Sequence, residues 1–349
     1  MGQNQKKGGF YINYPTISII LPTYNESSGV KICINSIKNL NYPKNKLEII
    51  AVDDGSQDDT VSNLIKYDIK ILKQKHLGCS NARNNGANYA SGEILAFLDA
   101  DDACNENWLI EMINFINIEK VAAVGCSHEL LNSKPNDLTM ISYLEKSFRH
   151  KESPTKTEHI GASGSLINRE IFKKIGGFNP KLIAAEDADL CNKIKNLGFD
   201  IIIIKKPLIK VEYPSNIISY FKKQIRNSAY HTYFIYTNQA KARGNKYSSI
   251  LDYVQSIFPL LTIISLYFNN IFLELLFIAL ILINLKFIFF LMHNRHGLSH
   301  FWPLSAMFYL IIRSISWNLG LIYGTILIIR DIFLRGRNNE NIHDKSTIY

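Results

Sequence analysis

The sequence has few cysteines and none of the spacings that hold zinc or a disulfide framework. Its five cysteines, an odd number, show no CxxC pattern, which favours a reducing compartment and argues against a zinc site. The first ten residues, MGQNQKKGGF, lack the apolar run of a signal peptide. We therefore expect residues 1–14 to form a flexible tail, and the polar part of the chain to lie in the cytoplasm.

A basic stripe with interleaved aromatic residues, the signature of a nucleic-acid-binding surface, is also missing. The net charge is +9, but no single arm or repeat carries it, so we expect no nucleic-acid partner. Basic residues instead flank a long apolar stretch, with Lys222, Lys223 and Arg226 before it and Arg330, Arg335 and Arg337 after it. Such flanks are typical of the cytoplasmic side of a membrane protein.

Residues 251–330 are predicted to form transmembrane helices, because most of them are Ile, Leu, Phe and Tyr. A helical crossing needs roughly 20 apolar residues. Of the blocks 254–268, 271–292 and 304–329, only the second and third are long enough. If the basic polar tail at 331–349 lies on the same side as the catalytic domain, the number of crossings is even, which favours two crossings over three.

Two further features of the sequence concern this membrane region. Arg313 lies inside the third block, where a charge is costly and indicates either contact with a lipid phosphate or a side chain that reaches the interface. Residues 216–250 precede the blocks and are predicted to form an interfacial linker. There, apolar residues recur at the helical spacing of an amphipathic helix, at Ile217, Ile218, Phe221 and Ile225.

Residues 15–215 show the alternation of strands and helices of an α/β domain. Apolar runs bounded by turn residues occur at 17–21, 47–52, 93–98, 121–125 and 201–204, and helical patterns occur at 28–40, 58–66, 79–91 and 105–117. Continuous apolar runs are typical of strands that are covered on both faces. We predict a mainly parallel sheet flanked by helices, in which ligands bind beyond the carboxyl ends of the strands.

Three successive predicted strands end in acidic or small polar residues: PTYNE, DDGS and DADD. Turn residues commonly end strands, so each cluster alone has a structural explanation. Three clusters at one sheet edge instead predict a ligand site. Asp99 and Asp101, two residues apart in extended chain, would place both carboxylates on one face. A divalent cation held there, Mn²⁺ or Mg²⁺, would neutralise the phosphates of a nucleoside diphosphate.

The segments ISIILPTYNE, VDDGSQDDT, GCSNARNNGANYASGEILAFLDADD and GGFNPKLIAAEDADL, in this order, resemble the family 2 glycosyltransferases, which have a GT-A fold. The resemblance covers about residues 15–215 and depends on the ordered set rather than on any one motif. It implies that Asp99 and Asp101 form the DxD motif. Asp101 would ligate the metal, and Asp99 would reach the ribose or a metal-bound water.

The same resemblance assigns a site for the nucleotide-sugar donor. The strand-end residues that would line it are Pro22, Thr23 and Glu26. Asp53 and Asp54 would contact the base and the ribose, with Asp54 preferred as the base contact. A carboxylate can accept a hydrogen bond from uracil N3–H, which favours a UDP-sugar. Arg83 would close over the base, with an ordinary surface-helix role as the alternative.

The chemistry also needs a base. Direct displacement at the anomeric carbon inverts it, and a carboxylate must reach the acceptor hydroxyl as that hydroxyl attacks. Glu186 and Asp187 begin a predicted helix, and Asp187 matches the family's catalytic aspartate. The alternative role for Asp187 is to cap the helix. The small residues at 161–165 either allow a sugar or acceptor to approach closely or form only a tight turn.

One departure from the family concerns processivity. Processive members carry QxxRW after the base, whereas the nearest match here is QIRN at 224–227. We expect one sugar per transfer, with Arg226 as a candidate contact to the diphosphate. A membrane-anchored enzyme with a soluble donor implies a membrane lipid or lipid-linked acceptor, such as a polyprenyl-linked sugar. The alternatives are a catalytically silent membrane scaffold and a sugar nucleotidyltransferase, although PTYNESSG is not a Gly/Lys-rich phosphate loop.

Overall fold

The computed structural model describes residues 6–7, 10–11, 14–151, 155–237, 282 and 284–343. The chain divides into two compact units. The first contains Met1–Asn132, Arg149–Lys181 and Glu186–Glu212, and the second contains Ser133–Phe148, Leu182–Ala185 and Tyr213–Tyr349. The chain therefore passes between the units more than once, and residues 133–148, within the expected catalytic domain, belong to the second unit.

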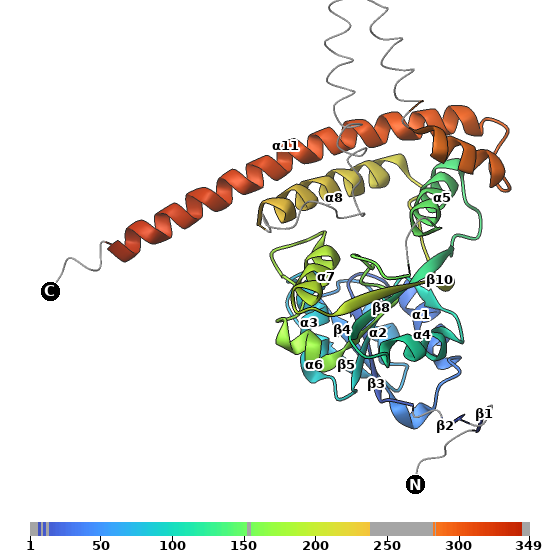
Figure 1. Ribbon diagram of the computed structural model, residues 1–349, viewed down its shortest axis with the longest axis vertical. Coiled ribbons are helices and arrows are strands. Elements are labelled where there is room, and N and C mark those ends of the chain that lie inside the picture. The colour runs from blue at the N-terminus through green and yellow to red at the C-terminus, as the bar shows by residue number, and fades with distance from the viewer. Residues whose placement is uncertain are drawn as a thin grey trace, which may run out of the picture. The chain divides into compact units, whose positions relative to one another are not determined.

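The first unit is built on a mixed, mostly parallel sheet, which confirms the predicted fold class (Figure 1). Its strand order is β5-β4-β3-β6-β9-β8-β10-β7. The strands β3, β4, β5 and β6 are mutually parallel, β8 is parallel to β10, and β9 and β7 pair antiparallel to their neighbours. The bounds are β3 (Ile17–Thr23), β4 (Leu47–Asp53), β5 (Lys70–Lys73), β6 (Ile94–Phe97), β7 (Ala103–Cys104), β8 (Val121–Leu130), β9 (Ser165–Asn168) and β10 (Asp200–Val211). Separately, β1 (Lys6–Lys7) pairs with β2 (Phe10–Tyr11).

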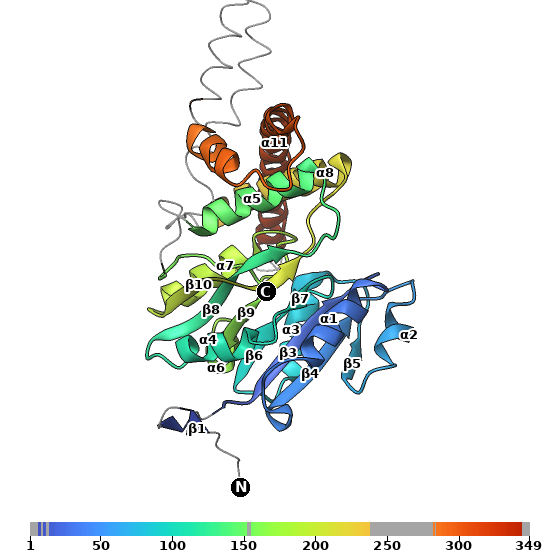
Figure 2. The same cartoon turned by 90° about the vertical axis from the view of Figure 1, so that its right-hand side faces the viewer.

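Helices cover both faces of this sheet. On one face, α1 (Gly29–Lys38), α2 (Thr60–Leu64) and α4 (Trp108–Ile116) pack on one set of strand residues. On the other face, α3 (Cys79–Tyr89), α6 (Arg169–Lys174) and α7 (Glu186–Asn196) pack on the alternate set. Figure 2 looks onto the face covered by α1. Because successive strand residues point to opposite faces, Ile19 and Ile20 enter different cores, as expected of continuous apolar strands.

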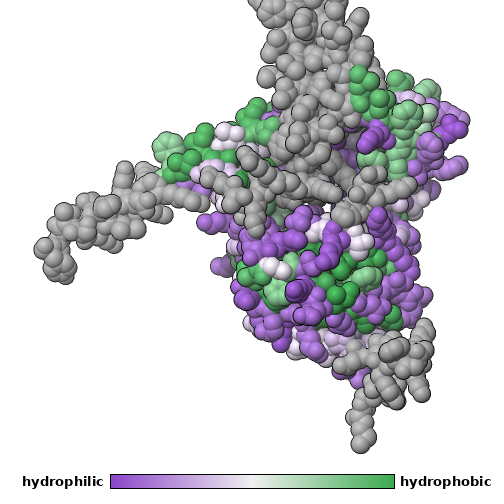
Figure 3. Space-filling model, in the orientation of Figure 1, coloured by the Kyte–Doolittle hydropathy of each residue, from purple (hydrophilic) through white to green (hydrophobic). Residues whose placement is uncertain are grey.

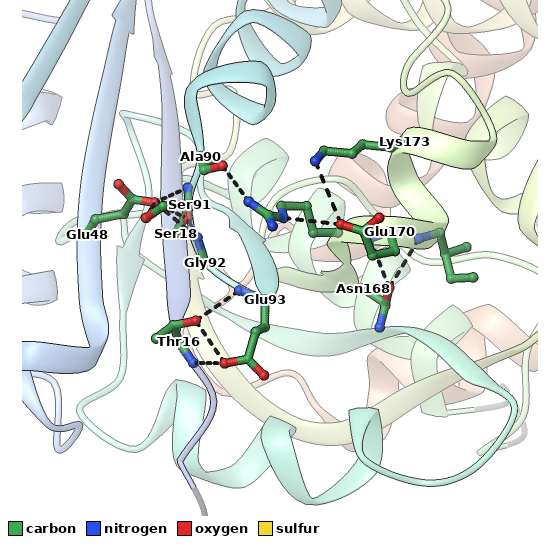
Figure 4. A network of polar contacts seen from close by, with 12 residues as sticks. Thr16, Ser18, Glu48, Ala90, Ser91, Gly92, Glu93, Asn168, Glu170 and Lys173 are labelled. Atoms are coloured by element: carbon green, nitrogen blue, oxygen red, sulfur yellow. Dashed lines mark hydrogen bonds and ion pairs between the residues drawn. The ribbon is translucent and has the colours of Figure 1, made fainter. Parts of the chain in front are cut away.

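Polar contacts hold the amino-terminal ends of the central strands together (Figure 4). The Glu93 carboxylate accepts hydrogen bonds from the backbone N–H of Thr16 (3.1 Å) and from its hydroxyl (2.9 Å). The Glu48 carboxylate accepts from the hydroxyls of Ser18 and Ser91, and these bonds lower its pKa despite partial burial. These bonds fix the strand register at the amino-terminal ends. The carboxyl ends of the same strands therefore remain available to functional side chains.

The described part of the second unit is helical. It contains α5 (Asp137–Lys151), α8 (Ile217–Thr237), a helix over 284–293 and α11 (Trp302–His343). A shared core joins them, formed by Ile141, Leu144, Tyr220, Phe287, Leu291, Ala306, Tyr309 and Leu310. The Asp137 carboxylate accepts hydrogen bonds from Ser299 N–H (2.9 Å) and from the Ser305 hydroxyl (2.6 Å). The sequence analysis did not anticipate α5.

One helix in the described part of the chain, α11 over Trp302–Leu334, is long and apolar enough to cross a membrane by length and composition. It contains the predicted block 304–329. The block 254–268, and nearly all of 271–292 before residue 284, lie outside the described residues, so the number of crossings stays a prediction. Arg313 forms an ion pair with Glu145 of α5 (3.1 Å) and is buried.

Candidate active site

The carboxyl ends of β3, β4 and β6 bring the predicted polar residues to one edge of the sheet. Pro22 and Thr23 end β3, and Thr23 pairs in register with Asp53 at the end of β4. The Thr23 hydroxyl donates to the carbonyl oxygen of Val52 (3.2 Å), which binds the two strand ends together. Because β6 also runs parallel to β3, the chain that leaves it reaches Asp99 at this edge.

An acidic cluster follows β6. Asp99, Asp101 and Asp102 offer carboxylate oxygens that all lie within 4.8 Å of one another. Ser163, from the small-residue segment before β9, donates its hydroxyl to Asp102 and accepts from the backbone N–H of Asp99 (3.0 Å). An all-oxygen donor set suits Mg²⁺ or Mn²⁺. These residues therefore fit a divalent cation, with Asp102 added to the predicted pair.

Arg83 of α3 links this cluster to the start of α7. Its side chain is buried, and its guanidinium donates to Asp99 Oδ1 (2.7 Å) and to Glu186 Oε1 (3.0 Å). The guanidinium also lies over the ring of Phe178, 5.3 Å from its centroid. We expected Arg83 to close over a base. In the structure, its guanidinium forms ion pairs with the carboxylates of Asp99 and Glu186, which are far apart in the sequence.

Glu26 lies beside the acidic cluster. Burial, and then the charges of Asp101, Glu212, Asp58 and Asp99, together raise the pKa of its carboxyl to about 7. A Cβ at Gly29 would lie 3.0 Å from Asp101 Cα and 3.1 Å from Glu26 Oε2. Because residue 29 is glycine, the chain after β6 can lie close to the first turn of α1 and to Glu26. Glu26 and Asp101 can therefore contribute to one ligand site.

Asp54 is fully engaged by the segment that leads into α3. One carboxylate oxygen accepts from the side-chain amide of Gln74 (2.7 Å) and the N–H of Leu77 (2.8 Å), and the other accepts from the N–H of Gly78 (2.9 Å). His76 Nδ1 lies 3.0 Å from the same carboxylate. Asp54 therefore holds the shape of residues 74–78, a role that the sequence pattern did not reveal.

Asp53 is more available than Asp54. Its carboxylate accepts one hydrogen bond, from the backbone N–H of Ser56 (3.2 Å), and no other from the described residues. Near this strand end, the ring of Tyr24 is 40% exposed and stacks on His76 with centroids 4.1 Å apart. The Asp53 carboxylate therefore has fewer hydrogen-bond partners among the described residues than the Asp54 carboxylate.

The start of α7 presents a second pair of acids. Ala185, just before it, has a φ of +64°, in the left-handed region that residues other than glycine seldom adopt. Asp187 accepts from the N–H of Ala188 (2.8 Å), as a carboxylate at a helix N-terminus does. Its other oxygen lies 3.3 Å from Nε2 of His159. Burial and then the Asp187 charge raise the pKa of Glu186, while Arg83 opposes them.

One predicted site residue belongs to the other unit, and one residue of the site was not predicted. Arg226 lies in α8, in the second unit, so its contact with a diphosphate stays a prediction. His159 was not anticipated, because it belongs to no recognisable motif and approaches Asp187 only through the fold. Ser163, in contrast, lies within the small-residue segment 161–165, for which close approach to a ligand was one expectation.

Comparisons with known proteins identify the family that this chain resembles. Residues 18–176 match the family model described as glycosyl transferase family 2. The chain is 28% identical over 195 residues to glycosyltransferase AglE of Haloferax volcanii, covering 54% of this chain and 64% of that protein. It is 28% identical over 237 residues to the beta-monoglucosyldiacylglycerol synthase of Trichormus variabilis, covering 64% of this chain and 50% of that protein. The chain thus spans less than two thirds of both relatives.

A solved structure shares the fold. The mannosyltransferase PcManGT of Pyrobaculum calidifontis, in complex with GDP-Man and Mn²⁺, matches with a TM-score of 0.57 at 21% identity, covering 88% of each chain. The likeness extends over the sheet and beyond it, and it agrees with the mixed, mostly parallel sheet described above.

Proposed function

Since the chain belongs to the family 2 glycosyltransferases, we propose that it transfers one sugar, with inversion, from a nucleotide-sugar to a membrane-held acceptor. The donor is a UDP-sugar, and the acceptor is a membrane lipid or a lipid-linked sugar such as a polyprenyl-linked one. The protein acts at the cell membrane, with its catalytic unit on the cytoplasmic side.

The observation that carries this proposal is the double contact of Arg83. By binding Asp99 and Glu186 at once, it ties the acidic cluster after β6 to the residue next to Asp187. A donor diphosphate at the cluster and an acceptor hydroxyl at Asp187 would then meet in one site. Two clusters of acids without such a link would have no reason to be chemically related.

The donor would bind along the carboxyl edge of the sheet. We assign the base contact to Asp53, whose carboxylate can accept from uracil N3–H, and leave Asp54 to shape residues 74–78. Pro22, Thr23 and Glu26 line the same edge. The exposed ring of Tyr24 offers a flat apolar surface beside them.

Asp99 and Asp101 would hold a divalent cation, with Asp102 beside them. When bound, the cation supplies positive charge next to the diphosphate and so stabilises it as a leaving group. Mn²⁺ accompanies GDP-Man in the PcManGT structure, which supports this metal class. Arg83 neutralises part of the negative charge of Asp99.

Asp187 acts as the base. Inversion by direct displacement requires that the attacking hydroxyl loses its proton to a carboxylate within hydrogen-bond reach. One oxygen of Asp187 is held by Ala188 N–H, and the pairing with His159 orients the carboxylate. Glu186, committed to Arg83, acts as a positioning residue.

The membrane-held acceptor is inferred from the chain's apolar C-terminal region. The helix α11 is long and apolar enough to span a bilayer, and one relative is named as a synthase of a glycosylated diacylglycerol. An enzyme anchored at the bilayer encounters acceptors in two dimensions, which favours a lipid over a soluble sugar.

The test is a donor screen with the purified full chain, membrane lipid extract and Mn²⁺ or Mg²⁺. Release of UDP is measured from each UDP-sugar, with GDP-mannose as the competing donor. We expect turnover with a UDP-sugar, loss of turnover in Asp101→Asn, and a loss of about 10²–10⁴-fold in Asp187→Asn with donor binding retained. The exposed Asp68→Asn serves as the matched control.

Four outcomes would contradict parts of the proposal. Turnover with GDP-mannose alone would overturn the UDP assignment. Full activity of Asp187→Asn would remove the base. Donor binding without turnover for any donor or lipid would favour the scaffold alternative, whereas formation of a nucleotide-sugar from a sugar phosphate would favour a nucleotidyltransferase.

A further inference from the structure

Exposed apolar residues follow one side of α11, and hydrophobic surface is in view on the parts of α11 that Figure 3 leaves uncovered. The exposed residues recur at intervals of three, four or seven and therefore lie on one side of the helix. Each is 38–73% exposed, and we call this set the outer stripe: Leu304, Phe308, Ile315, Leu319, Ile322, Ile326, Ile329 and Phe333. No acidic residue occurs between 302 and 330, and Arg313 is the one basic residue before Arg330. Such a surface is not compatible with water along its whole length.

The opposite side of α11 is covered by protein, chiefly by α8. Ser228 donates its hydroxyl to the carbonyl oxygen of Trp317 (2.8 Å), and the Trp317 indole N–H donates to Gln224 (3.1 Å). A Cβ at Gly320 would lie 2.4 Å from Ser228 Cβ, and one at Gly324 would lie 2.7 Å from the carbonyl oxygen of Ala229. The two helices therefore pack in direct backbone contact.

Charged residues lie beside the middle of α11. The Arg313–Glu145 pair is buried against it. On α8, the ring of Tyr220 packs against that of Tyr309, with centroids 5.0 Å apart. Eight residues further along both helices, Ser228 of α8 contacts Trp317 of α11. The exposed Lys222, Lys223 and Arg226 fall between these two contacts. If α11 crossed the bilayer, α8 would enter the hydrocarbon with it and carry these three cations to its centre, which is strongly unfavourable.

We propose that α11 does not cross the membrane but lies in its plane, with the outer stripe inserted into one leaflet of a bilayer that contains anionic phospholipids. The outer stripe spans about 45 Å at 1.5 Å per residue, longer than the roughly 30 Å hydrocarbon core that a crossing helix needs to match. A helix with one apolar side, and with its polar contacts on the other, is the form that lies at an interface.

The ends and flanks of α11 agree with this arrangement. Arg330 is exposed at the edge of the outer stripe, where its side chain can reach lipid phosphates while its stem stays apolar. On α8, the cations lie on the side away from the contacts with α11, so they face water or headgroups and avoid the hydrocarbon. The inference rests on the proposed membrane location, and it differs from the expectation of a crossing at 304–329.

The first test asks on which side of the membrane the two ends of α11 lie. In the full chain carrying Cys79→Ser, whose remaining cysteines are buried, single cysteines are placed at His296, at Asn339 and at the exposed Asp68 of the catalytic unit. Intact membrane vesicles are then treated with a membrane-impermeant maleimide, with and without detergent. We expect His296→Cys and Asn339→Cys to show the same labelling pattern. Either both react without detergent, or both react only after detergent is added. Labelling of one only after detergent is added would mean a crossing and would overturn the proposal.

The second test measures depth. Nitroxide labels at Leu319, Ile322 and Ile326 of the same protein, in vesicles of phosphatidylcholine and phosphatidylglycerol, are compared for accessibility to oxygen and to a water-soluble nickel complex. We expect all three at similar depth. A steady change in depth along the helix would mean a crossing, and three water-exposed labels would mean that protein or solvent, not lipid, covers the outer stripe.

Failure of the membrane location itself has a separate signature. If the full chain remains soluble and does not float with these vesicles while donor turnover persists, both the membrane-held acceptor and this inference are wrong. If the chain floats but α11 crosses, the inference alone is wrong.

Discussion

Replacing Arg83 by methionine should destabilise the catalytic unit by an amount that the structure bounds. Arg83 is buried between Asp99 and Glu186, at 2.7 Å and 3.0 Å. Breaking a buried pair costs about 3–5 kcal/mol, because the remaining charge stays in the protein without its partner. Asp99 is 34% exposed and can recover part of its hydration, so we expect a loss of about 2–4 kcal/mol in the free energy of unfolding.

The pH dependence of this loss follows from Glu186, whose pKa is raised by burial and by Asp187 even with Arg83 present. Removing the guanidinium raises it further, so that the Glu186 carboxyl in the variant takes up a proton at a higher pH than in the wild type. Once protonated, it no longer leaves a buried charge. The destabilisation of Arg83→Met should therefore be largest at alkaline pH and shrink as the pH falls.

Thermal unfolding of the purified protein across a pH series provides the measurement. A shift of roughly 2–4 °C per kcal/mol is expected for a domain of this size. Lys156→Met removes an ion pair with Asp200 in which Lys156 is 71% exposed, and as the matched control it should cost at most about 1 kcal/mol. The double variant Arg83→Met/Glu186→Gln should recover part of the loss. A deficit below that of the control, or one independent of pH, would refute the reasoning.

Three further predictions concern other parts of the chain. Glu26→Gln should become more stable relative to wild type as the pH rises from about 4.5 to 7. The reason is that the native Glu26 carboxyl keeps its proton to about pH 7, whereas the same carboxyl in the unfolded chain has already lost it. Melting temperatures of the variant and wild type at pH 5 and 8 measure this, and an equal difference between them at both pH values would contradict it. Gly86→Ala places a Cβ 2.5 Å from Ile20 and should cost about 1–3 kcal/mol, whereas Gly161→Ala, with its nearest neighbour at 3.9 Å, should be nearly neutral in the same assay. Asp137→Asn should lose the bonds to Ser299, at about 1–2 kcal/mol near neutral pH; because the native pKa of Asp137 is lowered, its contribution disappears as the pH falls through that value, and a constant difference would argue against it.

Much of the catalytic unit could be predicted because its signals are local. The five apolar runs that are bounded by turn residues correspond to strands β3, β4, β6, β8 and β10. The shorter β5 and β7, with four and two residues, carry too little apolar pattern to be recognised. The helix α5 was missed because its apolar side packs on α8 and α11, which lie far along the chain.

The sequence by itself determined that acidic side chains gather at one sheet edge. Parallel strands share a direction, so residues that follow β3, β4 and β6 meet without any further information. The DADD segment and its capacity for a divalent cation follow from residue type and spacing alone. The same holds for the apolar character of α11, which composition is sufficient to reveal.

Only the tertiary structure decided which side chains pair. Arg83 and Glu186 are 103 residues apart, and Glu145 and Tyr309 are 164 apart. His159 meets Asp187, and Asp54 is engaged by residues 74–78. Such contacts depend on how each helix is rotated and where it packs, and a change of one residue in register would abolish them. The periodic apolar pattern of a helix indicates which side is buried, but the identity of the residue opposite comes from packing between distant segments.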